Sequence, residues 1–515
     1  MVAFLVVLLA GCSWGPEIPA GDPVRPDVIV ISIDTLRADH LSSYGHDRPT
    51  SPFMDGLAEQ GSRFEHARST SPWTLPAHTT MLSGQLPTTH QVTDDHLSLD
   101  ASVAVLPEIM KQAGYHTAAS VATLYVSRKF GFDRGFDFFD DHGITTEKIN
   151  LSGSVTADKV IGSAVDWMED VPAGEPVFLF LHFYDVHYHY DPPAPFATMF
   201  DRAPSSDDRR FKNYYAHKKN PLTEEQAAHQ LAQYDESIRY VDDQLRQLAK
   251  RMSDAGRKTR WVITSDHGEE FGERGSWGHA HTLYAEQLRV PLIVSGEGLP
   301  SGVVIKDPVG IHDIAPTVAK WVDGDLPDAD GINLAPAMGG ASIPDRPFPA
   351  ETFRFKTRRI SLYENGNRIE WNLNKNAVEL FAADSDRGEA VDLAQAQPEI
   401  AKNLRNRAEE VFGQPWTANA DGKVSAKKGR VVRNGARKKR QVQAGQTFQV
   451  FPYDAPVSFE AADGTVQGPW RSTTEATPPA GAPLTYSAEV RTAGVTLDAE
   501  TRKRLEALGY VQSED

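Results

Sequence analysis

Three continuous apolar runs, each closed by an aspartate, constrain the fold of this chain more than any other feature. The runs cover residues 27–34, 177–185 and 261–266, and they end in Asp34, Asp185 and Asp266. Unbroken apolar runs of this length are typical of strands that are buried on both faces of a parallel sheet. The carboxyl ends of parallel strands meet at one edge of the sheet, where ligands bind. The pattern therefore predicts three carboxylates close together at that edge.

Helical patterns lie between the apolar runs. The clearest begins with the capping box Thr223-Glu-Glu-Gln226 and keeps an apolar residue every three or four positions as far as Leu248. A fourth apolar run covers residues 290–294. Strands that alternate with helices predict an α/β fold, with a mixed, mostly parallel sheet flanked by helices.

Carboxylates gathered in a partly dry site repel one another unless cations compensate their charge. Carboxylate oxygens and imidazole nitrogens are suitable ligands for divalent metals. The nearby histidines are His267 after Asp266, His187 and His189 after Asp185, and His281, in competition with His279, before the fourth run. We therefore expect one or two divalent ions as cofactor, with Ca, Mg, Mn and Zn as candidates.

A threonine within residues 72–84 is a candidate nucleophile. Thr74 precedes Leu75 and Pro76, a pattern that predicts a helix beginning here with Thr74 as its N-cap. The positive end of a helix stabilises an alkoxide and a bound oxyanion. A metal-bound threonine at this place would be an activated nucleophile, so the cap and the nucleophile are compatible roles.

The only cysteine, Cys12, follows a short apolar run, and Leu9-Ala10-Gly11-Cys12 resembles a bacterial lipobox. The run is shorter than the roughly 20 residues of a membrane-spanning helix and has the length of a secretory signal. We expect a lipidated Cys12 that anchors the protein to a membrane of the bacterial cell envelope, facing the periplasm or the exterior. An ordinary cleaved signal with an incidental cysteine is the alternative.

Composition changes along the chain suggest its domain organisation. Beyond residue 353, short alternating strands and a helix near 398–412 indicate a smaller antiparallel subdomain, and 421–440 holds nine Lys or Arg. We take that basic stretch as part of a solvated, partly disordered segment. The expected divisions are a signal at 1–12, a tether at 13–25, a catalytic domain at 26–350, a C-terminal subdomain at 351–415, the basic and Pro/Gly-rich segment at 416–490, and a tail at 491–515.

The overall charge excludes one class of function. The chain has 53 Lys and Arg against 70 Asp and Glu, a net charge of -17. A general nucleic-acid binder would carry a basic footprint, so no nucleic-acid partner is expected. The oligomeric state stays open.

Five motifs in this order resemble the sulfatase family of the alkaline phosphatase superfamily. They are Asp34-Thr-Leu-Arg-Ala-Asp39 with Tyr44-Gly45, the box at 74–78, Asp185-Val-His187, Ser265-Asp-His-Gly268, and Tyr284 through Pro291, with a further likeness at 505–510. The resemblance implies an alkaline-phosphatase-like α/β core with a smaller C-terminal antiparallel sheet. It also implies hydrolysis of phosphate or sulfate esters, of small molecules or of glycans.

The resemblance assigns roles to individual residues. Asp34, Asp266 and His267 would hold the main metal, and the Thr74 oxygen would complete it. His78 stands where the sulfatase signature has arginine, and His187 matches a histidine that contacts the transferred group. A second metal site would use Asp185, His189 and His281, similar to the phosphatase branch.

Two residues depart from the family pattern. Sulfatases of this type convert a Cys or Ser to formylglycine, and Thr74 cannot give that aldehyde. Thr35 replaces an aspartate that is common in true sulfatases. The Thr35 departure weakens a calcium site built from paired acids, and the Thr74 departure favours phosphate esters or diesters, or transfer to another acceptor, through an unmodified threonine. A catalytically silent, metal-stabilised lipoprotein that binds sulfated or phosphorylated glycans is the alternative.

Overall fold

The structure is a computed structural model of the chain. It describes residues 18–94, 97–141, 143, 155–201, 222–355, 357–426, 430–433, 436–437, 440–451, 457–470, 481–486 and 492–507. The expected lipidation site, Cys12, lies outside the described residues. No helix in the described part of the chain has both the length and the apolar character needed to cross a bilayer.

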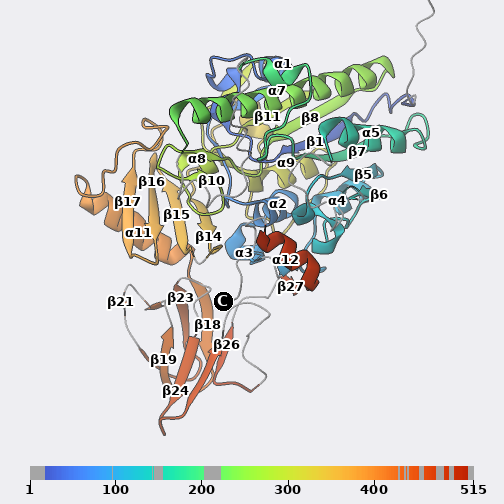
Figure 1. The fold of residues 1–515 in the computed structure, drawn as a ribbon. Coiled ribbons are helices and arrows are strands. Elements are labelled where there is room, and N and C mark those ends of the chain that lie inside the picture. Colours follow the sequence, from blue (N-terminus) through green and yellow to red (C-terminus); the bar gives the residue numbers. More distant parts are fainter. Residues whose placement is uncertain are drawn as a thin grey trace, which may run out of the picture.

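An eight-stranded sheet forms the centre of the molecule (Figure 1). Its strands, in spatial order, are β12 (Val303–Ile305), β2 (Ser62–Phe64), β11 (Leu292–Gly296), β8 (Thr259–Thr264), β1 (Asp27–Ile33), β7 (Val177–Phe183), β5 (His116–Ser120) and β6 (Phe138–Asp140). The five strands from β8 to β6 are parallel, whereas β11 is antiparallel to both β8 and β2. The predicted α/β fold with a mixed, mostly parallel sheet is confirmed, and the fourth apolar run forms the antiparallel strand β11.

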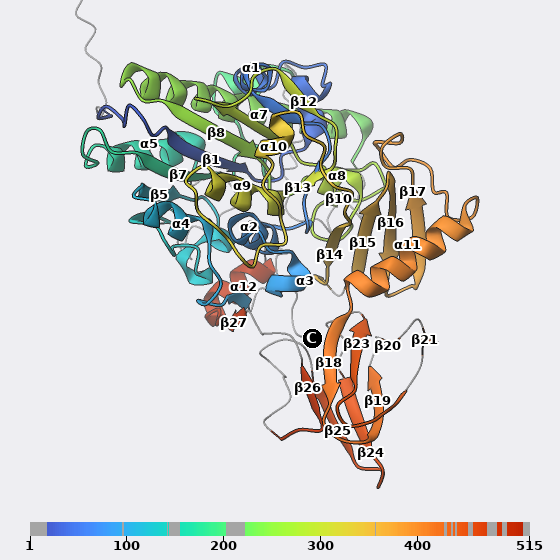
Figure 2. The ribbon, with the colours of Figure 1, turned by 180° about the vertical axis from the view of Figure 1, so that it is seen from behind.

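The central strands are apolar on both faces because helices cover both. Ile29, Ile31 and Ile33 of β1 join a core with α1 (Pro52–Gln60), α5 (Ala157–Met168) and α7 (Glu224–Asp254). Val28 and Val30 point the other way and join a core with α2 (Thr74–Ser83), α4 (Leu106–Gln112) and α9 (Ile314–Lys320). Figure 2 shows the two helical layers from behind. This alternation across the strand fixes the register of β1 and thereby the position of Asp34 at its end.

A four-stranded antiparallel sheet follows the eight-stranded sheet in the chain. It consists of β14 (Phe348–Thr352), β15 (Arg359–Glu364), β16 (Asn367–Asn372) and β17 (Ala377–Phe381). Helix α11 (Pro398–Val411) packs on it through an apolar cluster that includes Trp371 and Leu404. The small C-terminal antiparallel sheet implied by the family resemblance is therefore present.

The stretch expected to be partly disordered, 416–490, contains strands in its described part. They are β18 (Gln414–Ala418), β19 (Gly422–Ala426), β20 (Arg430–Arg433), β21 (Ala436–Arg437), β22 (Arg440–Val442), β23 (Thr447–Phe451), β24 (Val457–Ala461), β25 (Val466–Trp470) and β26 (Leu484–Tyr486). They form two sheets around an apolar cluster that includes Trp416, Val424 and Phe459. The described part of this segment is therefore folded, and partial disorder of the whole stretch stays a prediction.

The chain then returns to the catalytic core. Strand β27 (Thr492–Gly494) pairs with β4 (Leu97–Leu99), and α12 (Ala499–Ala507) lies near α2 and α3 (Pro87–His90), as both views show. Leu497 and Leu505 belong to the main apolar core.

A tyrosine of α7 holds the turn that follows β1. The Tyr234 hydroxyl accepts a hydrogen bond from Arg37 N and donates one to Thr35 O, each at 2.8 Å. Thr35 has φ of 59°, a left-handed conformation that a β-branched residue rarely adopts. The turn is therefore held by tertiary contacts and not by local preference.

We predict that Tyr234→Phe lowers the free energy of unfolding by about 1–3 kcal/mol, because it leaves a buried N–H and a buried C=O without a partner. Urea unfolding followed by tryptophan fluorescence measures this change. Tyr240→Phe is the matched control on the same helix, since the Tyr240 hydroxyl donates to the exposed Asp158 and water can replace it. Equal stability of Tyr234→Phe and wild type would show that the turn does not depend on this contact.

Candidate metal centre and active site

Two neighbouring strands bring three candidate metal ligands together. Asp34 follows β1, and Asp266 and His267 follow β8, which pairs with β1 in parallel. One ligand atom from each residue lies within 4.8 Å of the others, and all three side chains are fully buried. The structure therefore gathers Asp34 at one sheet edge with Asp266 and His267, which follow it by more than two hundred positions in the chain.

Buried oxygens of this cluster have no hydrogen-bond partner. Both carboxylate oxygens of Asp34 and Oδ2 of Asp266 are in this position. Burial raises the pKa of Asp34 to about 7, and burial together with the charge of Asp34 raises the pKa of Asp266. Three carboxylate oxygens left without donors in a dry site are costly, and a divalent cation would compensate both acids. The residues present therefore fit a metal.

His267 is oriented as a metal-binding histidine. Its Nδ1 donates to the backbone carbonyl of Gly268 at 2.9 Å, which leaves the lone pair of Nε2 for a cation. Nε2 lies 3.3 Å from Oδ2 of Asp266 and 3.7 Å from Oδ1 of Asp34. A second hydrogen bond that fixes the ring in this way is typical of metal ligands.

Thr74 lies at the start of α2 and faces the same cluster. Its Oγ1 is 3.5 Å from Nε2 of His267, and its residue is 5% exposed. The N-cap of α2 is Trp73, without a side-chain cap bond, so the predicted cap role of Thr74 is wrong. Thr74 is the first helical residue, and its hydroxyl is therefore not engaged by the helix backbone.

His78 is turned inward, one helical turn after Thr74. Its Nδ1 donates to Thr74 O, and its Nε2 accepts from the Ser32 hydroxyl, each at 2.9 Å. Burial lowers the pKa of His78 to about 4, so the ring is neutral near pH 7. Both ring nitrogens of His78 thus form hydrogen bonds within the protein, and neither is directed at a substrate.

Sequence reasoning missed His182, a polar residue inside β7. Its Nε2 lies 3.3 Å from Oδ2 of Asp34, and its ring centroid is 5.0 Å from that of His78. Burial lowers the pKa of His182 to about 4. A histidine within an otherwise apolar strand was the available signal, because such a residue needs a polar neighbour.

The residues predicted for a second metal do not come together. Oδ1 of Asp185 accepts from Ala157 N at the start of α5, at 3.2 Å. His281 Nε2 lies 2.8 Å from the Ser276 hydroxyl and 3.2 Å from Glu270. Among the described residues, no group of three close metal-binding side chains contains Asp185, His189 or His281. Asp185, unlike the other two strand-end acids, turns toward a helix, and the second metal site stays a prediction.

Two further imidazoles lie next to the cluster. The His279 ring is 4.4 Å from the His267 ring and 4.9 Å from the His187 ring, measured between centroids. Nδ1 of His279 donates to the buried Glu269 at 2.9 Å, and burial lowers the pKa of both His187 and His279 well below 6.5. Of the two histidines that the sequence left in competition, His279 is therefore the one beside the site.

A second group with ligand-like geometry is already satisfied by protein contacts. His40 Nδ1 and His46 Nε2 lie 2.7 and 3.0 Å from the two oxygens of Asp235, and Arg48 donates to the same carboxylate at 2.8 Å. No buried polar atom of these four residues is without a partner in the described part of the chain. This group is a hydrogen-bonded network between the first loop and α7, and it does not call for a metal.

Comparisons with known proteins agree with this geometry. The family model described as Sulfatase matches residues 26–324. Choline-sulfatase of Rhizobium meliloti is 25% identical over 376 residues, which cover 61% of this chain and 72% of the relative. Arylsulfatase K of Danio rerio is 24% identical over 455 residues, which cover 76% of this chain and 84% of the relative.

A solved structure shares the fold. The phosphonate monoester hydrolase of Agrobacterium radiobacter aligns with a TM-score of 0.61 and 18% sequence identity, covering 75% of this chain and 95% of that protein. The family match contains Asp34, Thr74, Asp266 and His267, and so it covers the whole cluster.

We predict one divalent metal per chain, held by the cluster. Asp34→Asn and Asp266→Asn keep the side-chain size but remove the charge, and both are expected to purify with little metal in elemental analysis. Asp185→Asn is the matched control, and it is expected to keep the wild-type metal content. Full metal content in Asp34→Asn would contradict this assignment, and loss of metal from Asp185→Asn would support the second site predicted from sequence.

Proposed function

Because the chain belongs to the sulfatase family and is an ester hydrolase of that family, we propose that it cleaves phosphate or sulfate esters with Thr74 as nucleophile and a divalent metal as cofactor. The observation that carries the proposal is the meeting of the Thr74 hydroxyl with His267 and the buried acid Asp34, in the cluster that also contains Asp266. A hydroxyl beside a cation site at a helix start suits attack on phosphorus or sulfur.

Asp34, Asp266 and His267 would hold the metal, with the Thr74 oxygen as a further ligand. When bound, such an ion supplies Lewis acidity, which favours the deprotonated hydroxyl and withdraws charge from the ester oxygens. The start of α2 adds the positive end of a ten-residue helix at the same place.

Of the two imidazoles beside the cluster, His279 is better suited to move protons, because both ring nitrogens of His187 already contact the protein, at Tyr188 O and at the Tyr184 hydroxyl. His187 and His279 are neutral near pH 7, because burial depresses their pKa values. The Thr74 oxygen forms a bond to phosphorus or sulfur, and the ester oxygen leaves with the proton that an imidazole took from the hydroxyl. Water then cleaves the threonine ester, and its proton returns through the imidazole to the Thr74 oxygen.

The second step distinguishes this chain from formylglycine sulfatases. An aldehyde hydrate can release sulfate by elimination, whereas an esterified threonine must be attacked by water. Attack by water on such an ester favours phosphate or phosphonate over sulfate chemistry. The relatives carry names of both kinds, from choline-sulfatase to phosphonate monoester hydrolase.

An arginine near the nucleophile supports an anionic substrate. Arg354 stacks on the ring of Trp73, 3.9 Å from its centroid, and donates to the Tyr125 hydroxyl at 2.9 Å. Its charge helps to depress the pKa of His279, which shows that the two lie close together. We assign Arg354 to the ester oxygens or to an acidic neighbour group of a small-molecule or glycan substrate. The inward-facing His78 is a positioning residue for Thr74.

We predict that Thr74→Ala lowers kcat by a factor of about 10⁴ or more, because it removes the nucleophile. Turnover is measured on a panel of aryl phosphate, phosphonate and sulfate esters, with metal content and thermal unfolding as checks on the fold. Thr74→Ser keeps a hydroxyl and is expected to retain measurable activity.

Thr79→Ala is the matched control, since Thr79 lies on the same helix and donates only to the backbone of Leu75. Its turnover is expected to remain near that of wild type. Undiminished turnover by Thr74→Ala would exclude the threonine nucleophile. Metal binding without turnover of any ester in wild type would instead favour the silent glycan-binding lipoprotein.

We further propose the domain division given above and a lipidated Cys12 that places the enzyme in the bacterial cell envelope. A lipobox-like sequence before the only cysteine supports this proposal. Cys12→Ser is expected to abolish incorporation of labelled palmitate and to release the protein from membranes of a Gram-negative host. Unchanged labelling of Cys12→Ser would exclude lipidation at this residue.

A further inference from the structure

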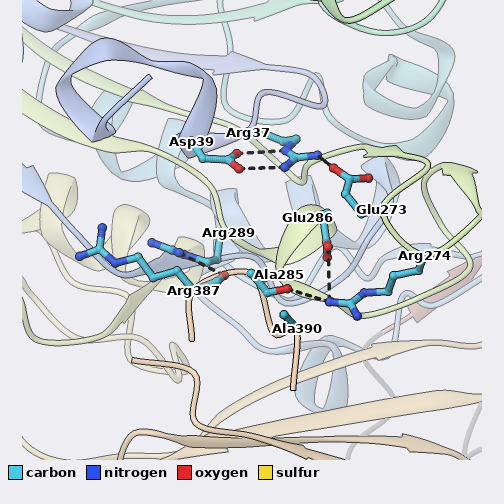
Figure 3. Close-up of a pocket in the computed structure, with 10 residues that line it drawn as sticks. Arg37, Asp39, Glu273, Arg274, Ala285, Glu286, Arg289, Arg387 and Ala390 are labelled. Carbon is cyan, nitrogen blue, oxygen red and sulfur yellow. Dashed lines mark hydrogen bonds and ion pairs between the residues drawn. The ribbon is translucent and has the colours of Figure 1, made fainter. Parts of the chain in front are cut away.

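A charged pocket lies between the catalytic core and a loop beyond the four-stranded sheet. It has a volume of about 350 Å³, within the range of small-molecule sites. Its walls come from the turn after β1, the loop between β9 (Glu270–Phe271) and β10 (Trp277–Gly278), helix α8 (Ala285–Leu288) with Arg289, and residues 387–390. Figure 3 shows these side chains around the pocket.

Three of the four arginines that line the pocket are paired with acids. Arg37 binds Asp39 and Glu273, and Figure 3 draws it between them. Arg274 lies 3.4 Å from Glu286, and Arg387 lies 2.9 Å from Glu65, which is outside the pocket lining. The charges of these three arginines are therefore largely compensated by the protein.

The fourth arginine and two further atoms are not satisfied. Arg289 forms no ion pair with a described acid, and its guanidinium donates only to the backbone carbonyls of Glu65 and Arg387, at 3.4 Å each. Oε2 of Glu286 and Nε of Arg274 are buried without a hydrogen-bond partner. Glu286 is only 7% exposed. The pocket thus presents an arginine that forms no close ion pair, although the charges of Asp39 and Glu389 act on it, together with an unused acceptor and an unused donor.

The pocket is separate from the metal centre, although it lies directly behind it. None of its lining residues belongs to the cluster of Asp34, Asp266 and His267. Gly268, which follows His267, packs so closely on Glu286 that an added Cβ would lie 2.1 Å from the Glu286 carbonyl oxygen. One backbone layer therefore divides the two sites.

We propose that this pocket is a second ligand site, which binds a hydroxylated organic anion of monosaccharide size, with the anionic group on Arg289 and a hydroxyl on Glu286. A guanidinium binds carboxylate, phosphate and sulfate groups through paired hydrogen bonds. A sugar hydroxyl donates to the free carboxylate oxygen of Glu286, and a ring or hydroxyl oxygen accepts from Nε of Arg274. In this arrangement the ligand forms hydrogen bonds with the Arg289 guanidinium, with Oε2 of Glu286 and with Nε of Arg274.

Calorimetric titration of the metal-loaded protein tests this site. The probes are glucuronate, which has no ester to hydrolyse, and glucose 6-sulfate, with glucose as the uncharged control. The background is Thr74→Ala, which prevents turnover. Binding of glucuronate is expected to weaken about tenfold or more in Arg289→Gln, because the paired hydrogen bonds are lost. A tenfold change corresponds to about 1.4 kcal/mol.

Two further variants separate the pocket from indirect effects. Ala390→Phe fills the exposed mouth of the pocket without changing charge, and it is expected to abolish glucuronate binding even if Arg289→Gln folds poorly. Arg246→Gln, on an exposed part of α7, removes an equal charge and is expected to leave binding unchanged. Equal affinity in Arg289→Gln and the background protein, glucose binding as strong as glucuronate binding, or the absence of binding by both anions overturns the proposal.

Discussion

Two buried carboxylates whose oxygens mostly have no donor are the constraint on which the rest of this structure depends. Asp34 and Asp266 end adjacent parallel strands, and the protein offers them no hydrogen bonds at three of their four oxygens. Desolvation and mutual repulsion would drive one of them to protonate, as the pKa of about 7 for Asp34 indicates. A divalent cation relieves both costs. The cluster therefore fits a bound cation, whose positive charge would balance the two acids.

The fold holds these acids in place from both sides of the sheet. Alternating residues of β1 are buried in two different cores, so the strand cannot slip by one residue without exposing an entire apolar face. Tyr234 of α7 then fixes the turn that follows Asp34. Helix α2 brings Thr74 from another part of the chain, and α12 closes over the same core at the end of the chain. Rigid elements thus carry each member of the site.

Unsatisfied polar atoms distinguish functional sites from structural networks in this molecule. His40, His46 and Asp235 have the geometry of metal ligands, but protein donors already satisfy them. The Asp34 cluster and the pocket around Arg289 differ, because buried groups there have no partner among the described residues. The Asp34 cluster fits a cation, and the pocket around Arg289 fits an anion with hydroxyl groups. Buried polar atoms without partners therefore support both the metal site at Asp34 and the proposed ligand site at Arg289.

The sequence alone determined the α/β class, the ends of the central strands and three members of the cluster. It could do so because unbroken apolar runs predict buried parallel strands, and parallel strands place their last residues at one edge. Asp34, Asp266 and His267 met there as predicted from their spacing. Only the tertiary structure decided that Asp185 turns to helix α5, that His279 and not His281 lies beside the site, and that His182 joins it. These outcomes depend on the direction in which each side chain leaves its strand or loop, and that direction is set by packing with distant segments that local patterns do not encode.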